Sequence, residues 1–402
     1  MNNKRIYFIF LSIIVLNSCI ENKSTFPSEE SVHQLMNEAL QKSDLPAVVA
    51  IAIDKKGEKV IYNYGKAIWS EDVEVTQEHI FRIWSMTKLV TSIAAMQCVE
   101  NGIIGLDNDL CDIMPEMTDI PILSNGKLIK PKNKITLRHL LTHTSGFGYS
   151  GMTVEEGNYN KENWDYSDSP RHFESGTNFL YGTSTDWVGK LVEKISGMDL
   201  EVYFRKNITG PLKMGRTFFN VPDSLHSLIV SYGHRGDRGE KELEELPNRV
   251  PTNKATVLSG GGGLFSTPSD YTKLLQCILN YGAYEGGRIL SKATIEEMIQ
   301  NQVGDINLSP QDRHFNPGVC CNFNGLMDEN SKWGLAFMID NNSKEYGRQD
   351  GTVTWGGLMN TYFYIDFKSG IAASIYTQHL PFNNYQTTSL FEQFSEIIFT
   401  KN

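Results

Sequence analysis

Ser85 and Lys88 stand three residues apart where a helical pattern begins. The apolar run 89–99 continues the pattern and Gly102 closes it, so we expect a buried helix. Side chains three apart on a helix are neighbours, which brings the Lys88 amine to the Ser85 hydroxyl. A serine nucleophile needs a proton acceptor, and the free N–H groups of a first helical turn suit an oxyanion. The spacing indicates a nucleophilic serine, although a serine here also suits a simple helix N-cap.

Tyr181 lies just ahead of a second helical pattern, within the stretch 176–197. The apolar positions of that pattern are Trp187, Val188, Leu191, Val192 and Ile195. A tyrosine before a helix usually packs, so only a place beside Ser85 and Lys88 would give it a chemical role.

The segment 259–264 is rich in glycine but lacks the Gly-Lys-Ser/Thr of a phosphate loop. Glycine lets the backbone approach another group closely. The segment therefore predicts backbone close to a site, followed by a helix capped around 267–270.

His139 and His143 have the spacing of helical metal ligands, on a short helix expected from Ile135 to Gly146. No Glu stands between them and no third ligand is evident, so both are interpreted as structural. The sequence predicts neither a metal nor a cofactor.

The chain has 402 residues, 40% of them hydrophobic, and a formal net charge of −10. This length allows a large core in one or two domains. No cluster of Lys and Arg offsets the negative charge, which argues against nucleic acid as a partner. The expected partner is a small-molecule acyl substrate.

The N-terminus has the features of a targeting segment. Lys4 and Arg5 precede the apolar run 6–16, which is too short for a comfortable membrane span. Leu16-Asn-Ser-Cys19 follows and resembles a bacterial lipoprotein signal with Cys19 as the lipidated residue. We expect residues 1–19 to be this signal and 20–30 a tether, which places the protein on a cell-envelope membrane facing the periplasm or exterior. A plain secretory signal and an N-terminal anchor helix are the alternatives.

Strand patterns occur at both ends of the chain and helices between them. The expected strands are 47–54, 60–64, 333–339, 360–366 and 371–376, and a helix over about 385–399 closes the chain. This order predicts an α/β (α+β) fold in which both chain ends build one antiparallel sheet, flanked by helices. Within the domain 31–402, the sheet region is 31–88 plus 255–402, and 89–254 is a mainly helical insertion.

Together these motifs resemble the serine β-lactamase and penicillin-binding-protein superfamily, in its class C β-lactamase and β-lactamase-fold esterase branch. Ser85-x-x-Lys88 matches the first family motif, and Tyr181 matches the tyrosine of the second, Tyr-x-Asn. Segments 141–146, 211–214 and 260–264 are family-like too. The resemblance implies a β-lactamase/transpeptidase-like fold with Ser85, Lys88 and Tyr181 as catalytic residues.

Two departures from the family pattern bear on the substrate. Thr183 stands where the second motif has Asn, and Trp355-Gly356-Gly357-Leu358 stands where β-lactamases have Lys-Thr-Gly. The second segment resembles the Trp-x-Gly form of the esterase branch. It lacks the lysine that would pair with a substrate carboxylate. Arg348 is the nearest upstream cation that could replace it, and the Leu358 N–H is expected to be the second oxyanion donor beside Ser85.

The sequence therefore predicts an exported serine hydrolase that acts on carboxylic esters or related acyl compounds. Ser85 would attack the carbonyl while Tyr181, with Lys88, takes its proton, and water would then hydrolyse the acyl-enzyme. Which of these two side chains is the base stays open. A β-lactamase or D-amino-acid peptidase is the alternative, and a catalytically silent binding protein of the same fold is a further one.

Overall fold

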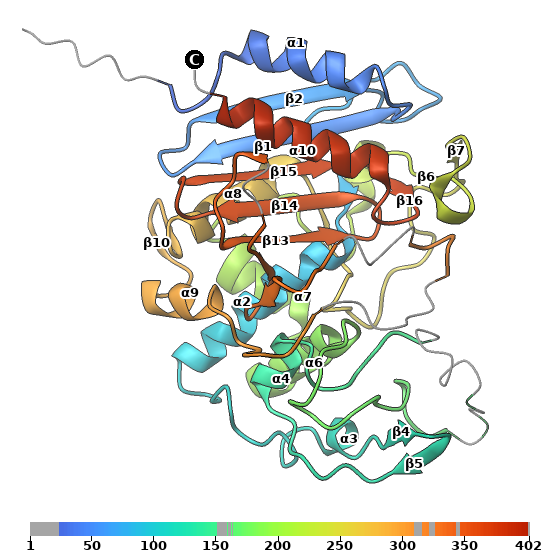
Figure 1. The fold of residues 1–402 in the computed structure, drawn as a ribbon, viewed down its shortest axis with the longest axis vertical. Coiled ribbons are helices and arrows are strands. Elements are labelled where there is room, and N and C mark those ends of the chain that lie inside the picture. The colour runs from blue at the N-terminus through green and yellow to red at the C-terminus, as the bar shows by residue number, and fades with distance from the viewer. Residues whose placement is uncertain are drawn as a thin grey trace, which may run out of the picture.

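In the computed structural model, one antiparallel sheet of seven strands forms the centre of the fold (Figure 1). The structure describes residues 24–150, 159, 162, 164–308, 316–320, 326–342 and 346–400. The strands, in spatial order, are β11 (Lys332–Trp333), β12 (Met338–Asp340), β13 (Thr352–Gly357), β14 (Thr361–Asp366), β15 (Ile371–Tyr376), β1 (Ala47–Asp54) and β2 (Lys59–Gly65). The pairing of β15 with β1 joins the two chain ends, as predicted.

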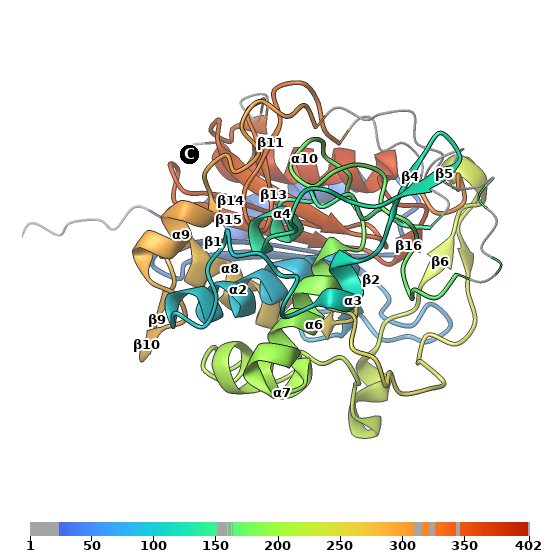
Figure 2. The ribbon, with the colours of Figure 1, turned by 90° about the horizontal axis from the view of Figure 1, so that it is seen from below.

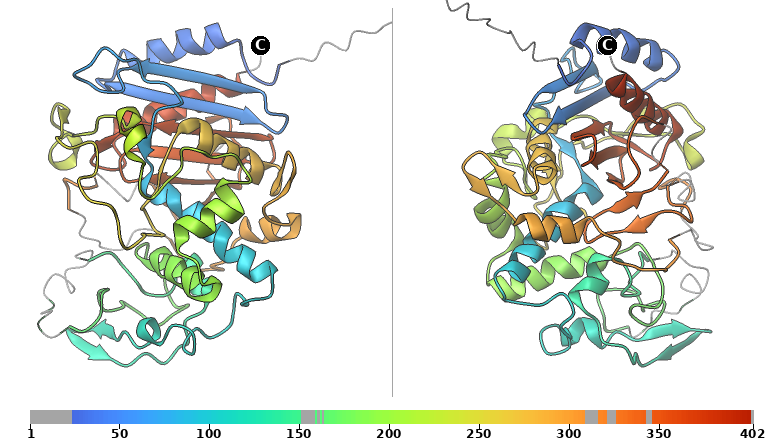
Figure 3. Two further views of the ribbon diagram at one scale, coloured as in Figure 1. Left: turned by 180° about the vertical axis from the view of Figure 1, so that it is seen from behind. Right: turned by 60° about the vertical axis from the view of Figure 1, so that its left-hand side comes forward.

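Helices cover both faces of this sheet. The α-helices are α1 (Glu29–Leu40), α2 (Thr87–Glu100), α3 (Pro115–Thr118), α4 (Leu137–Leu141), α6 (Ser184–Ser196), α7 (Leu200–Phe204), α8 (Pro268–Leu279), α9 (Lys292–Met298) and α10 (Tyr385–Phe399). Helices α1 and α10 pack together on one face, and α8 packs on the other, across β1 and β15 (Figure 3, left). All eight residues of β1 are buried, as expected for a strand covered on both sides.

Short elements complete the chain. The paired strands are β3 (Phe81–Arg82) with β8 (Phe265–Ser266), β4 (Ile122–Ser124) with β5 (Lys127–Ile129), β9 (Ala283–Tyr284) with β10 (Gly287–Arg288), and β6 (Gly233–His234) with β7 (Glu244–Glu245) and β16 (His379–Leu380). Single helical turns are η1 (Trp84–Met86), η2 (Arg205–Thr209), η3 (Asp223–Leu228) and η4 (Asp237–Gly239).

Helix α2 lies between the sheet and the helical region. It contacts α6 and α7, and Figure 2 shows α2 and α6 close together from below. Its residues from Thr87 to Cys98 are all buried. The prediction of a buried helix after Ser85 is therefore confirmed.

Two predicted elements differ from the structure. The single strand expected over 333–339 is a hairpin, because the Gly334 N–H bonds the Phe337 carbonyl at 2.9 Å and turns the chain between β11 and β12. A side chain at Gly334 would collide with the Met298 carbonyl, so this turn is packed against the end of α9. The helix expected to end at Gly146 ends instead at Leu141.

Residues 1–23, with the predicted signal and Cys19, lie outside the described residues. None of the helices that the structure describes has both the length and the apolar character needed to cross a membrane.

Candidate active site

Ser85 lies in the turn η1, directly before α2. Met86 is the N-cap residue of α2, and no side chain caps either η1 or α2. The Ser85 hydroxyl is therefore not used as a helix cap, and it accepts a hydrogen bond of 3.2 Å from Lys88 Nζ. Trp84 has a positive φ of 45°, a costly conformation for a bulky residue, as occurs where a functional side chain must be presented.

Lys88 is buried and donates three hydrogen bonds. Besides the bond to Ser85, its Nζ donates to the Gly261 carbonyl at 2.7 Å and to the Tyr149 hydroxyl at 3.1 Å. An ammonium group has three N–H donors and no acceptor. The three contacts therefore fit a protonated Lys88 that supports Ser85 electrostatically.

The surroundings of Lys88 favour the same charge state. Burial by itself lowers its pKa, but Tyr149, Tyr181 and Asp186 face it and raise that pKa above the ordinary 10.5. With its pKa raised, Lys88 is an ammonium ion at neutral pH and has no free lone pair to accept the serine proton.

Tyr149 is a site residue that the sequence analysis missed. Its hydroxyl accepts from Lys88, and its ring lies 5.8 Å from the Tyr181 ring, centroid to centroid. Burial holds the pKa of Tyr149 above its ordinary value, and the adjacent Lys88 offsets only part of that rise. The available signal was its position three residues after the family-like segment 141–146.

Tyr181 faces Lys88, whose Nζ lies 4.8 Å from the centroid of the Tyr181 ring. The Trp355 indole N–H donates to the Tyr181 hydroxyl at 2.9 Å. His143 supports the same ring at 4.6 Å, centroid to centroid, and its Nδ1 accepts from the Gly182 N–H at 3.4 Å. The structure thus brings Ser85, Lys88 and Tyr181 to one place, as the motifs predicted.

The two histidines are not paired on one helix face. His139 caps the first turn of α4, where its Nδ1 accepts from the Thr136 N–H at 3.3 Å. His143 lies beyond the end of α4 with a positive φ of 55°, so the spacing of four residues has no helical meaning. Within the described parts of the chain, no three His, Cys, Asp or Glu side chains group as a metal site would require.

The segment Trp355–Leu358 borders the turn that carries Ser85. A Cβ at Gly357 would collide with the carbonyl oxygen of Ile83, so glycine is required for this close approach. Ser85 lies in η1 and Leu358 directly follows β13, so their backbone N–H groups come from the two segments that meet here. Their assignment as oxyanion donors stays a prediction.

The glycine-rich segment holds the opposite wall. Asp186 of α6 accepts from the Ser259 hydroxyl at 2.5 Å and from the Gly261 N–H at 3.0 Å. The Gly261 carbonyl in turn accepts from Lys88. Asp186, also missed from sequence, therefore holds the backbone that binds the site lysine, and the predicted close approach of backbone to the site is confirmed.

Neither side chain named for the family departures reaches the site as an alternative ligand. Thr183 donates a hydrogen bond to Asp168 and is not among the described residues that line the cavity. Arg348 is buried, pairs with Asp340 at 3.8 Å and lies over the Tyr364 ring. The suggestion that Arg348 replaces the missing lysine is therefore wrong, since Arg348 borders a different cavity.

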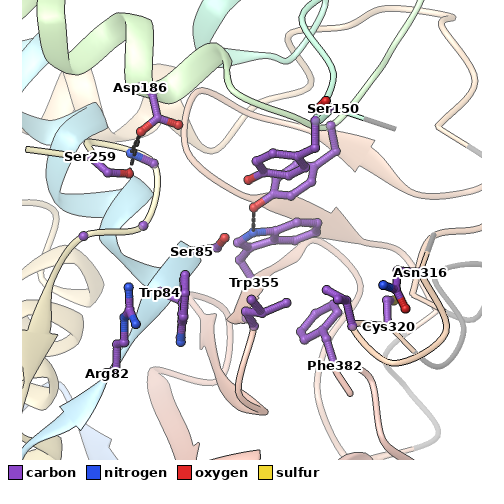
Figure 4. A pocket seen from close by; sticks show the side chains of 18 residues that line it. Arg82, Trp84, Ser85, Ser150, Asp186, Ser259, Asn316, Cys320, Trp355 and Phe382 are labelled. Atoms are coloured by element: carbon purple, nitrogen blue, oxygen red, sulfur yellow. Dashed lines mark hydrogen bonds between the residues drawn. The ribbon is translucent and has the colours of Figure 1, made fainter. Parts of the chain in front are cut away.

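A cavity of about 570 Å³ contains these groups. Figure 4 shows Ser85 and Trp355 in its middle, Arg82 and Trp84 at one end, and Asn316, Cys320 and Phe382 at the other. This volume suits a small-molecule substrate.

The chain resembles known acyl-transfer proteins along most of its length. Its sequence matches the family model described as Beta-lactamase over residues 32–391. Monacolin J acid methylbutanoyltransferase from Aspergillus terreus is 29% identical over 348 residues, which cover 80% of this chain and 82% of that protein. Lovastatin esterase from Penicillium rubens is 26% identical over 369 residues, covering 83% and 88%. Unliganded simvastatin synthase from Aspergillus terreus superposes with a TM-score of 0.76 at 27% identity, covering 92% of this chain and 97% of that one. The predicted fold is therefore confirmed.

Proposed function

Because this chain belongs to the β-lactamase family, whose members here include acyltransferases and esterases, we propose that it is a serine hydrolase of carboxylic esters. The observation that carries the proposal is the contact of 3.2 Å between Lys88 Nζ and the Ser85 hydroxyl, in the middle of an open cavity. Both groups needed for a serine acyl-enzyme are in place, beside two tyrosines.

The reaction has two displacement steps. In the first, the Ser85 oxygen bonds the ester carbonyl carbon, the bond to the alkoxy group breaks, and the serine proton passes to the leaving alcohol. In the second, water bonds the same carbon, the bond to Ser85 breaks, and the proton returns to Ser85. An alcohol that replaces water in the second step gives acyl transfer instead of hydrolysis.

Different groups of the protein support the charge, move the proton and bind the oxyanion. Lys88 remains an ammonium ion beside both tyrosines, and one hydroxyl of the pair Tyr149 and Tyr181 moves the proton. The N–H groups of Ser85 and Leu358 would bind the oxyanion. Charged and donor groups are thus aimed at the atoms where charge develops.

The substrate is an ester with an uncharged acyl group. Trp355 replaces the lysine that would bind a β-lactam or peptide carboxylate, and it engages its N–H with Tyr181. Leu358, Val319 and Phe382 add apolar surface to the cavity. A β-lactamase or D-amino-acid peptidase remains the alternative, favoured only by the fold.

Acylation of Ser85 is tested with a fluorophosphonate probe. Wild-type protein should be labelled, and Ser85→Ala should lose both labelling and ester hydrolysis while keeping its fold. The control Ser369→Ala changes an exposed serine in the turn between β14 and β15. Labelling that persists in Ser85→Ala would refute the nucleophile.

Substrate class is tested by assaying a chromogenic short-chain ester, a chromogenic cephalosporin and a D-alanyl peptide side by side. We expect the highest kcat/KM for the ester. Faster turnover of the cephalosporin would replace the proposal with the alternative.

We also propose that Cys19 is lipidated and holds the protein on a membrane of the cell envelope. The support is the sequence Leu16-Asn-Ser-Cys19 after a short apolar run. Metabolic labelling with an alkyne fatty acid should be lost in Cys19→Ala, and unchanged labelling would contradict the proposal.

A further inference from the structure

The two ends of the active-site cavity differ in charge. Arg82 stands at one end with Trp84, while the far end is formed by Asn316, Val319, Cys320 and Phe382 (Figure 4). Ser85 lies between them. The acyl and alkoxy groups of an ester extend in different directions from the carbonyl carbon, so a bound ester can place one of them at each end.

The Arg82 backbone is fixed in place. Its N–H donates to Gln378 Oε1 at 3.2 Å, and its carbonyl accepts from Gln378 Nε2 at 3.1 Å. Arg82 also belongs to β3, which pairs with β8. The guanidinium lies over Trp84, with Cζ 3.7 Å from the ring centroid. The charge is therefore held at a defined place, three residues before the nucleophile.

Among the described residues, the Arg82 guanidinium has no anionic partner within ion-pair distance. Its Nε is buried without a hydrogen bond, and none of the described residues forms an ion pair or hydrogen bond with its terminal nitrogens. Arginine side chains bind carboxylates with paired N–H donors. A charge stacked on an aromatic ring at the wall of a cavity thus keeps these donors available for a ligand.

The other charged groups of the site are already engaged. Lys88 donates to three acceptors, and Asp186 accepts from Ser259 and Gly261. Among the charged side chains that line the described part of the cavity, Arg82 is therefore the one that can pair with a substrate.

A second cavity begins at Arg82. It has a volume of about 740 Å³ and shares Arg82, Ser259 and Gly263 with the active-site cavity. Its further lining includes Phe219, Val221, His226 and Lys254. The Arg82 end thus opens into space for a large group, and the apolar end is left for the uncharged acyl group of the proposed function.

We infer that Arg82 binds a carboxylate carried by the alcohol part of the ester, so that the enzyme acts on esters of hydroxy acids. The inference rests on the proposed function, since it takes Ser85 as the nucleophile between the two ends. Arg82 is a specificity residue in this assignment and takes no part in proton transfer.

The test compares two acetyl esters that differ by one charge. These are 4-acetoxybenzoate, an anion, and 4-acetoxybenzamide, its neutral analogue. The measured quantity is the ratio of their kcat/KM values in the wild type, Arg82→Gln, Arg82→Lys and the control Arg288→Gln. Arg288→Gln removes the same charge from the exposed strand β10. Each variant provides its own neutral reference, so differences in leaving-group reactivity cancel.

We expect Arg82→Gln to lower the ratio by about tenfold to a hundredfold, as for loss of a charged hydrogen bond. Arg82→Lys should give an intermediate ratio and Arg288→Gln the wild-type ratio. If Arg82→Gln is unstable in a thermal melt, Arg82→Lys and inhibition of the wild type by 4-hydroxybenzoate against 4-hydroxybenzamide decide the point. Stronger inhibition by the acid is expected.

Two results would overturn the assignment. If the ratio is unchanged in Arg82→Gln and both esters are still hydrolysed, Arg82 does not bind the carboxylate, and the proposed function stands. If Arg82→Gln instead lowers kcat/KM only for 4-nitrophenyl monosuccinate relative to 4-nitrophenyl butyrate, Arg82 recognises a carboxylate on the acyl group and not on the alcohol. Failure of the wild type to hydrolyse any of these esters would instead refute the proposed function itself.

Discussion

The indole N–H of Trp355 donates a hydrogen bond of 2.9 Å to the hydroxyl of Tyr181, and their ring centroids lie 4.7 Å apart. An indole can only donate, so the Tyr181 oxygen is the acceptor. The bond links β13 to the segment before α6. Trp355 therefore does more than replace a lysine with an apolar face, because it orients a catalytic candidate and stabilises negative charge on its oxygen.

Trp355→Phe should keep the ring packing and remove this bond. A hydrogen bond of this kind contributes about 0.5–1.5 kcal/mol, which corresponds to a fall in kcat/KM of roughly twofold to tenfold. The control is Trp333→Phe, in the same ring cluster, where the lost bond is to the Leu141 carbonyl. Equal activity of Trp355→Phe and wild type would contradict a role for the bond.

Tyr149→Phe should impair catalysis although no family motif named Tyr149 in the sequence. It removes the hydroxyl that accepts from Lys88 at 3.1 Å. We expect acylation to slow by about a hundredfold or more if this phenol takes part in proton transfer. Burst kinetics with a chromogenic ester, beside Tyr181→Phe, give the acylation rate of each variant.

Tyr166→Phe is the matched control, because the Tyr166 hydroxyl is bonded to the Asp119 carbonyl outside the cavity. A Tyr149→Phe variant with wild-type acylation would leave Tyr181 as the proton carrier.

The sequence predicted the parts of the site that local spacing determines. Ser85 and Lys88 meet because one helical turn separates them. Tyr181 could be found only through its family motif. Arg82, Tyr149 and Asp186 were missed, because their roles arise from contacts between segments distant in the chain.

The predictions of secondary structure were wrong where tertiary packing overrides the local sequence pattern. The apolar run Trp333–Ile339 predicts a strand, yet the bond from the Leu335 N–H to the Met298 carbonyl, at 2.9 Å, holds a turn there. Trp355 gives a related lesson. It is buried against Trp333 and Tyr181 and also lines the cavity, and neither contact could be inferred from the local pattern.

Gly357→Ala should disturb the nucleophile. The added Cβ would meet the Ile83 carbonyl, which belongs to backbone and cannot rotate away, so β13 or the turn with Ser85 must shift. A displacement of about 1 Å in an active site can cost a hundredfold in rate. We therefore expect a large fall in kcat with the melting temperature less affected.

Gly215→Ala is the control for this change, since a Cβ there meets no atom within 4 Å. If Gly357→Ala were as active as Gly215→Ala, the close approach of β13 to Ser85 would not be needed for catalysis.

His379 should make the protein less stable in acid. Burial and the nearby Arg235 lower its pKa from 6.5 to about 3, against the opposing effects of the Leu380 backbone and Asp44. Its Nε2 contacts the Thr387 hydroxyl at 3.0 Å. Below pH 6.5 the unfolded chain binds a proton at His379 that the folded chain does not, so stability falls as the pH drops from 6.5 toward 3. The slope from this group is at most about 1.4 kcal/mol per pH unit.

Urea unfolding at a series of pH values checks this in the wild type and in His379→Gln, which keeps a polar side chain but cannot titrate. The free energy of unfolding of the wild type should fall more steeply below pH 6.5 than that of the variant, while above pH 6.5 the difference between them should be constant. His226→Gln, in the partly exposed turn η3, controls for removal of a histidine elsewhere. Parallel curves for wild type and His379→Gln would show that His379 takes up its proton equally in both states, and the predicted lowering of its pKa would then be wrong.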